Sequence, residues 1–238
     1  MRLLTKRTLA AELLALGFNL QATFEFEQLP STLHREMIRR EPESAGFRYL
    51  ILLGNGGSVF WRHLKQADAR QDKEQHPVDV YTRRMVESSF GDDARIVYPG
   101  NHLLPLQLLG KLAGWHHDSP LGLGIHPVFG LWFAYRAVIL SHAEFTPAAV
   151  ETEDPMESPC DSCGDKPCIA ACPALAASES GFEVQPCSDY RLQIDSPCQS
   201  RCISRLACPV ARAHRYAPDQ MTYHYDFSLE AIKRYRGS

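Results

Sequence analysis

Apolar side chains in the first 145 residues recur with two different spacings, which predict alternating helices and strands. Residues 1–17 place leucines among charged residues at helical spacing, and Gly17 follows as a helix terminator. The run FRYLILL at 47–53 is continuously apolar, as in a strand buried on both faces of a sheet, and the glycine-rich stretch at 54–57 is expected to end it. Further helices are expected at 30–40, 59–64, 77–91 and 103–113, and further strands at 19–27, 94–98 and 129–141. This alternation favours an α/β (α+β) layered domain over residues 1–145.

The pattern changes after residue 145. Residues 146–159 (TPAAVETEDPMESP) are acidic and contain proline but few apolar side chains, which is typical of a linker. Residues 160–238 follow as a second region, and its part from 160 to 215 lacks the long apolar stretches of a conventional core. We therefore expect this region to need another organising centre.

The charge balance excludes some classes of partner. The 238 residues include 25 Lys+Arg and 28 Asp+Glu, so neither nucleic acid nor an anionic membrane is expected to be attracted globally. No apolar run approaches the roughly 20 residues of a membrane span, and the N-terminus lacks the apolar stretch of a signal peptide. We expect a cytoplasmic protein, in which clustered cysteines are more often metal ligands than disulfide partners.

All eight cysteines lie between residues 160 and 208, in two groups that each end in Cys-Pro. The spacings are C-x2-C-x4-C-x3-C and C-x10-C-x3-C-x5-C. Four thiolates are the ligand set of a 4Fe-4S cluster. Two structural zinc sites would also use eight cysteines, but such sites typically show two C-x2-C pairs per ion, and this chain has one such pair.

The segments PCDSCGDKPCIAACPA and CISRLACPVARAHRY resemble a bacterial two-cluster ferredoxin module. In such modules the cysteine before the proline binds the other cluster, so the resemblance implies two cysteine sets that each take one ligand from the other group. Both spacings are wider than in the simplest ferredoxins, with Lys166 and Pro167 inserted before Cys168. A redox partner protein is also implied. The first set is Cys160, Cys163, Cys168 and Cys208, and the second set is Cys172, Cys187, Cys198 and Cys202.

The segment IHPVFGLWFAYRAVIL at 125–140 resembles the cobalamin-processing family that includes the human decyanating protein of cobalamin type C disease. That family implies a flavin-nitroreductase-like fold, base-off cobalamin binding and, in animals, the use of flavin or glutathione. The candidate cofactor-binding residues on this segment are His126, Gly130, Trp132 and Arg136. A guanidinium in an apolar strand needs an anion, so Arg136 would face either a corrin group or a local carboxylate. His126 would approach the cofactor or cap a turn.

Epoxyqueuosine reductases and corrinoid-dependent reductive dehalogenases are similar to the two halves together. They join a cobalamin-binding domain to a two-cluster module, so the resemblance implies electron flow through two 4Fe-4S clusters to a corrinoid in the first domain. Two alternatives stay open: a ferredoxin-type carrier whose first domain only docks a partner, and an epoxyqueuosine-reductase-like enzyme. A tRNA substrate is not expected, because this chain carries no helical-repeat tail and has a net charge of -3.

Overall fold

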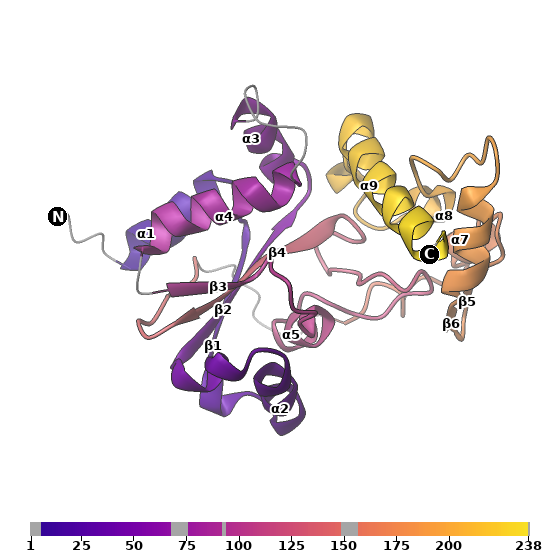
Figure 1. Cartoon of the computed structure of the whole chain (residues 1–238). Coiled ribbons are helices and arrows are strands. Elements are labelled where there is room, and N and C mark those ends of the chain that lie inside the picture. Colours follow the sequence, from indigo (N-terminus) through magenta and orange to yellow (C-terminus); the bar gives the residue numbers. More distant parts are fainter. Residues whose placement is uncertain (1–5, 68–75, 92–93, 149–156, 238) are drawn as a thin grey trace. The chain divides into compact units, whose positions relative to one another are not determined.

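The chain has the mixed α/β structure that the sequence pattern predicts, and it divides into two compact units. The computed structural model describes residues 6–67, 76–91, 94–148 and 157–237 (Figure 1). The first unit comprises residues 1–113 and 133–154, and the second comprises 114–132 and 155–238. Most of the expected linker, residues 149–156, lies outside the described residues.

The first unit is built on a four-stranded antiparallel sheet with the strand order β1-β2-β4-β3. β2 is buried at every position, which explains its continuously apolar sequence, and β4 is buried from Arg136 onward. These two central strands therefore hold the core of the unit. The strands are β1 (Leu20–Glu25), β2 (Tyr49–Gly56), β3 (Ala94–Tyr98) and β4 (Phe133–Ser141).

Five helices flank this sheet. α3 packs against α4 and β2, and α4 packs against β3 and β4, so these two helices cover the sheet together (Figure 1). Pro77 begins α4, where its missing N–H is not needed. The helices are α1 (Lys6–Ala15), α2 (Ser31–Arg40), α3 (Val59–Ala67), α4 (Pro77–Phe90) and α5 (Leu106–Leu112). None of the helices in the described ranges is long and apolar enough to cross a membrane.

Three predicted boundaries differ from the structure. β2 continues through Gly56, although the glycines were expected to end it at residue 53. β4 begins at Phe133 instead of residue 129, because His126 and Gly130 exchange backbone hydrogen bonds of 2.8 Å and form a turn. α5 begins after Pro105, because a proline disfavours the helical conformation of the residue before it, here Leu104.

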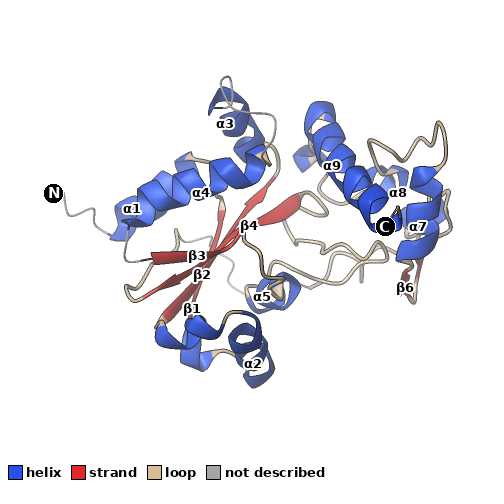
Figure 2. Ribbon diagram, viewed as in Figure 1, coloured by secondary structure: helices blue, strands red, loops and turns tan. Residues whose placement is uncertain are grey.

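The second unit consists of the long helix α9 (Pro218–Arg236), shorter helices, a two-stranded hairpin and loops (Figure 2). Its apolar core joins three side chains of the earlier segment 114–132, Leu121, Ile125 and Leu131, to cysteines of the later segment. Residues 114–132 thus differ from the expected domain division, which places them with the first 145 residues. The elements are α6 (Pro167–Ala170), β5 (Ala177–Ser178), β6 (Gly181–Phe182), α7 (Val184–Leu192), α8 (Ile203–Ala207) and α9 (Pro218–Arg236).

Gly17 lies at a position of the first unit where both the backbone conformation and the close packing require glycine. It ends the first helix with a φ of +96°, and a Cβ added there would lie 2.6 Å from the backbone Cα of Phe60. Replacement with alanine therefore costs the left-handed conformation, about 1–2 kcal/mol, and displaces backbone as well. We expect Gly17→Ala to lower the free energy of unfolding by more than about 2 kcal/mol in urea denaturation followed by circular dichroism.

Gly46 is the matched control, because a Cβ there would meet nothing within 4 Å and its φ is not left-handed. Gly46→Ala is expected to leave the free energy of unfolding within about 0.5 kcal/mol of the parent value. Equal effects of the two substitutions would contradict this account of Gly17.

Candidate iron-sulfur centre

The cysteines of the second unit lie on turns and at the ends of short helices. Cys168 lies on α6, Cys187 on α7, and Cys202 and Cys208 are the residues that flank α8 at its two ends. All eight are free thiols. Four of them are buried, so the thiols face protein more than solvent.

The second cysteine set lines one cavity of 370 Å³ within the second unit. Burial, with smaller contributions from the charges of Cys202, Cys172 and Cys198, raises the pKa of the Cys187 thiol to about 11, although Arg191 lowers it. The four sulfurs of this set therefore act on one another electrostatically around a common space. The set that lines the cavity is Cys172, Cys187, Cys198 and Cys202.

The first cysteine set shows the same mutual influence at a separate place. Burial raises the pKa of the Cys160 thiol to about 11, with smaller contributions from Cys208, Cys168 and Cys163 in that order. Burial also raises the pKa of Cys208, where Cys163 is the strongest cysteine neighbour. Cys208 thus lies within electrostatic reach of Cys160 and Cys163, although more than forty residues separate it from them in the sequence.

The two sets meet at two short helices that pack against each other, α6 and α8. α8 is five residues long, with Cys202 of the second set at its start and Cys208 of the first set at its end. A helix of this length rises roughly 7–8 Å, so a short rigid element fixes the spacing between the two sets.

Backbone N–H groups point at several of the sulfurs. The N–H of Arg205 donates to the Cys202 sulfur at 3.4 Å. Burial alone would raise the pKa of Cys172, but the Ser204 hydroxyl and the backbone N–H groups of Ala176, Ala177 and Ala174 outweigh it, and the pKa is lowered. Hydrogen bonds of this kind stabilise thiolate sulfur and tune the potentials of bound clusters.

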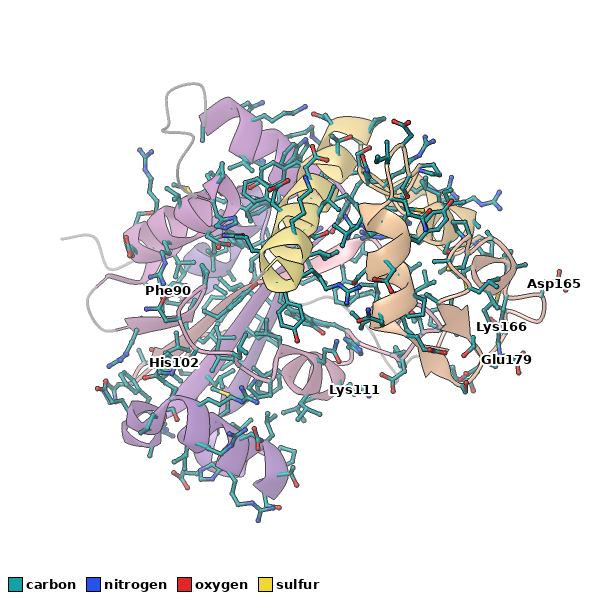
Figure 3. All side chains as sticks on the ribbon, turned by 45° about the vertical axis from the view of Figure 1, so that its right-hand side comes forward. Phe90, His102, Lys111, Asp165, Lys166 and Glu179 are labelled. Carbon is teal, nitrogen blue, oxygen red and sulfur yellow. The ribbon has the colours of Figure 1, made fainter. Side chains whose placement is uncertain are left out.

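The loop inserted before Cys168 is tied to the β5–β6 hairpin. Lys166 has a left-handed φ of +36°, and its ammonium lies 3.8 Å from the carboxylate of Glu179 (Figure 3). Pro167 then begins α6, which presents Cys168. The two extra residues therefore add a turn and a surface ion pair and leave the cysteine at the start of a helix.

Within the described ranges, no three His, Cys, Asp or Glu side chains are placed to hold one metal ion. The mutual influence of the thiols, the cavity and the N–H donors fit a cubane cluster held at its corners.

The four candidate cofactor residues fall in both units. His126, Gly130 and Trp132 lie in the second unit, and Arg136 lies in the first. In the first unit, the Arg136 Nε donates to Asn55 Oδ1 at 2.6 Å, and its guanidinium lies 4.6 Å from the centre of the Phe60 ring.

In the second unit, Gly130 has a φ of +57°, and a Cβ there would lie 3.0 Å from Val210 and Ala211. His126 caps the turn, because its Nδ1 accepts hydrogen bonds from the N–H groups of Val128 and Phe129. Turn capping is one of the two roles that the sequence left open for this histidine.

Sequence reasoning missed two buried arginines at the second set. Arg191 and Arg205 line the cavity, and Tyr225 lines it as well. The available signal was spacing: Arg191 lies four residues after Cys187 on α7, and Arg205 lies three after Cys202. On a helix these spacings place a side chain beside the cysteine one turn away.

Comparison with known proteins gives a fold. No protein-family model and no curated protein sequence matches the chain. Its fold is similar to that of epoxyqueuosine reductases. The enzyme from Streptococcus thermophilus has a TM-score of 0.51 at 13% identity, with 86% of this chain and 65% of that chain covered.

The Bacillus subtilis enzyme has a TM-score of 0.52 at 12% identity, with coverages of 88% and 66%. An epoxyqueuosine reductase bound to a modified tRNA-Tyr stem loop has a TM-score of 0.53 at 14% identity, with coverages of 90% and 67%. The chain thus spans about two thirds of the length of these enzymes, and the likeness concerns the fold.

The environment of His126 predicts a pH dependence. Burial, with smaller contributions from His117 and His214, lowers its pKa from 6.5 to about 4. The neutral form is thus favoured by the fold, so the stability it contributes is present above pH 6.5 and is lost as pH falls toward 4. Between pH 7 and pH 5 the protein should lose about 2 kcal/mol relative to His126→Asn, which keeps a hydrogen-bond acceptor but does not titrate.

Urea denaturation of both proteins at pH 7 and pH 5 measures this difference. His142→Asn is the control, because His142 is an exposed histidine that directly follows β4 in the first unit. Its free energy of unfolding should follow that of the parent protein at both pH values. A constant difference between the parent and His126→Asn would show that His126 does not resist protonation.

Proposed function

We propose that this chain is an iron-sulfur oxidoreductase that holds two 4Fe-4S clusters in its second unit. The single observation that carries the proposal is the 370 Å³ cavity lined by all four cysteines of the second set. The first set, which is linked by the mutual influence of its own four thiols, supports a second cluster. When bound, such clusters supply one-electron transfer.

The chain's own residues have three tasks in this proposal. The thiols hold the irons, and those whose pKa burial raises to about 11, Cys160 and Cys187, must lose their protons on loading. The backbone N–H groups near Cys172 and Cys202 stabilise thiolate sulfur. The apolar side chains of Leu121, Ile125 and Leu131 keep water from the cysteines they pack against.

We further propose that the electrons reach a corrinoid bound with the help of the first unit. The fold similarity to epoxyqueuosine reductases and the resemblance of segment 125–140 to the cobalamin-processing family support this. Arg136 is the candidate anchor, because a buried guanidinium attracts the anionic or carbonyl groups of a corrin side chain. The proposal includes no tRNA substrate, since the net charge of -3 gives no attraction to a polyanion.

Iron content tests the clusters. Protein purified without oxygen should contain about eight irons per chain and show broad charge-transfer absorption. Cys160→Ala with Cys208→Ala removes two ligands of one set and should leave one cluster's electron paramagnetic resonance signal as in the parent. Cys160→Ala with Cys172→Ala removes one ligand from each set and should change both signals.

The two double variants are matched, because each lacks two cysteines and shares Cys160→Ala. Zinc in place of iron in the parent protein would overturn the proposal. Identical spectra of the two variants would overturn the division into sets while leaving the clusters.

Corrinoid titration tests the second part. Adding cobalamin to the iron-loaded protein should shift the corrinoid absorption to the base-off form, and Arg136→Lys should weaken that binding about tenfold, or about 1.4 kcal/mol. Arg62→Gln, at an exposed arginine on α3, is the control and should bind as the parent does. No spectral shift with the parent protein would leave a ferredoxin-type electron carrier.

A further inference from the structure

Two guanidinium groups are buried beside the second cysteine set. Arg191 is 7% exposed and Arg205 is 8% exposed, and both line the 370 Å³ cavity. Neither forms an ion pair with a carboxylate of the described residues, and none of the described residues that line the cavity is acidic. Burial of an unpaired charge costs several kcal/mol, so these positions call for an anion.

Arg191 is held by neutral acceptors only. Its Nε donates to the Cys198 carbonyl at 3.0 Å, and its terminal nitrogens donate to the Gln199 carbonyl at 3.1 Å and to the Tyr225 carbonyl at 2.8 Å. A fourth bond goes to the Ser228 hydroxyl at 2.8 Å. These contacts fix the guanidinium in place next to a cysteine of the set but leave its charge uncompensated.

Arg205 lies between two aromatic rings. Its guanidinium carbon is 4.5 Å from the centre of the Trp132 ring and 4.9 Å from that of Tyr216. Its Nε is buried and has no hydrogen-bond partner in the part of the chain that the structure describes. The rings stabilise the cation, and the backbone N–H of the same residue donates to the Cys202 sulfur.

A cubane cluster bound by four thiolates is a net anion, and one-electron reduction makes it more negative by one charge. A fixed cation nearby stabilises the reduced form more than the oxidised form. The surroundings of the first set carry charges of both signs, with Asp161 acting on Cys160 and Arg212 and Arg215 acting on Cys208.

We propose that Arg191 and Arg205 are the counter-charges of the second cluster and raise its reduction potential above that of the first. The inference rests on the proposed function, because it needs both clusters. The balanced step is the transfer of one electron from a low-potential one-electron donor to the oxidised second cluster, with no bond formed or broken. Electrons delivered to the chain then collect on the second cluster. Neither arginine binds iron in this proposal, and both act by holding a positive charge at a fixed place beside the second cluster.

The test is a redox titration of the iron-loaded full chain, followed by electron paramagnetic resonance. The signal that survives in the protein with Cys160→Ala and Cys208→Ala identifies the second cluster. Arg205→Gln should make reduction of that cluster at least tenfold less favourable, about 59 mV, and leave the first cluster unchanged. Arg205→Lys keeps the charge and should shift the potential by less than half as much.

Arg201→Gln is the matched control, because Arg201 also lines the cavity but is exposed to solvent, where its charge is screened. It should leave both potentials close to those of the parent. Arg191→Gln should shift the second cluster in the same direction as Arg205→Gln. An unchanged potential of the second cluster in Arg205→Gln would overturn the inference.

A variant that fails to bind the second cluster also tests the inference. Loss of the second cluster in Arg205→Gln with retention in Arg205→Lys supports the charge requirement, whereas loss in both shows that shape and not charge is needed and overturns the inference. Absence of iron from the parent protein would instead refute the proposed function. The two failures are therefore distinguishable.

Discussion

The second unit depends on one constraint, which is the packing of apolar side chains from residues 114–132 against the cysteines. Residues 160–215 contain too few apolar side chains for a core, and Leu121, Ile125 and Leu131 of the segment 114–132 supply them. This segment lies between α5 and β4 of the first unit in the sequence, so one chain builds two cores with interleaved segments. The sulfurs of the cysteine region are thus surrounded by apolar side chains of the protein itself.

The low polarity that this packing creates determines the charges of the site. Thiols buried among apolar side chains have raised pKa values, so thiolate forms only where N–H donors, cations or iron stabilise it. The same low polarity makes a buried guanidinium costly. In our proposal, thiolate clusters and the cations of Arg191 and Arg205 stabilise each other, because neither charge is favourable alone at this place.

Much of the first unit follows from local sequence. Continuous apolar runs predict β2 and β4, and Pro77 and Gly17 mark the boundaries of helices by their backbone constraints. The end of β2 was missed because glycines can extend inside a sheet as well as turn. The start of β4 was missed because the turn at His126–Gly130 uses apolar residues that also suit a strand.

The association of residues 114–132 with the cysteines could not be predicted, since it depends on contacts far apart in the sequence. The cysteine sets could be proposed from the sequence, because the spacing of cysteines restricts which of them can be ligands even when the surrounding fold is unknown. The only sequence signal for Arg191 and Arg205 was a spacing of three or four residues from a cysteine, and many surface arginines show the same spacing. Their significance comes from burial without a carboxylate partner among the described residues, and burial is a tertiary property.

The proposed exchange of one cysteine between the two groups has a mechanical consequence. α8 begins at Cys202 of the second set and ends at Cys208 of the first, and α6 packs against it with Cys168 of the first set while Cys172 of the second set follows. Each helix thus carries or adjoins cysteines of both sets, so in the proposed function a shift of one site would move a ligand of the other. Five residues of helix set the spacing between the two cysteine sets more rigidly than a loop would. In our proposal the charges that separate the two potentials act across this fixed spacing, and the difference in potential would direct electrons without any movement of the protein.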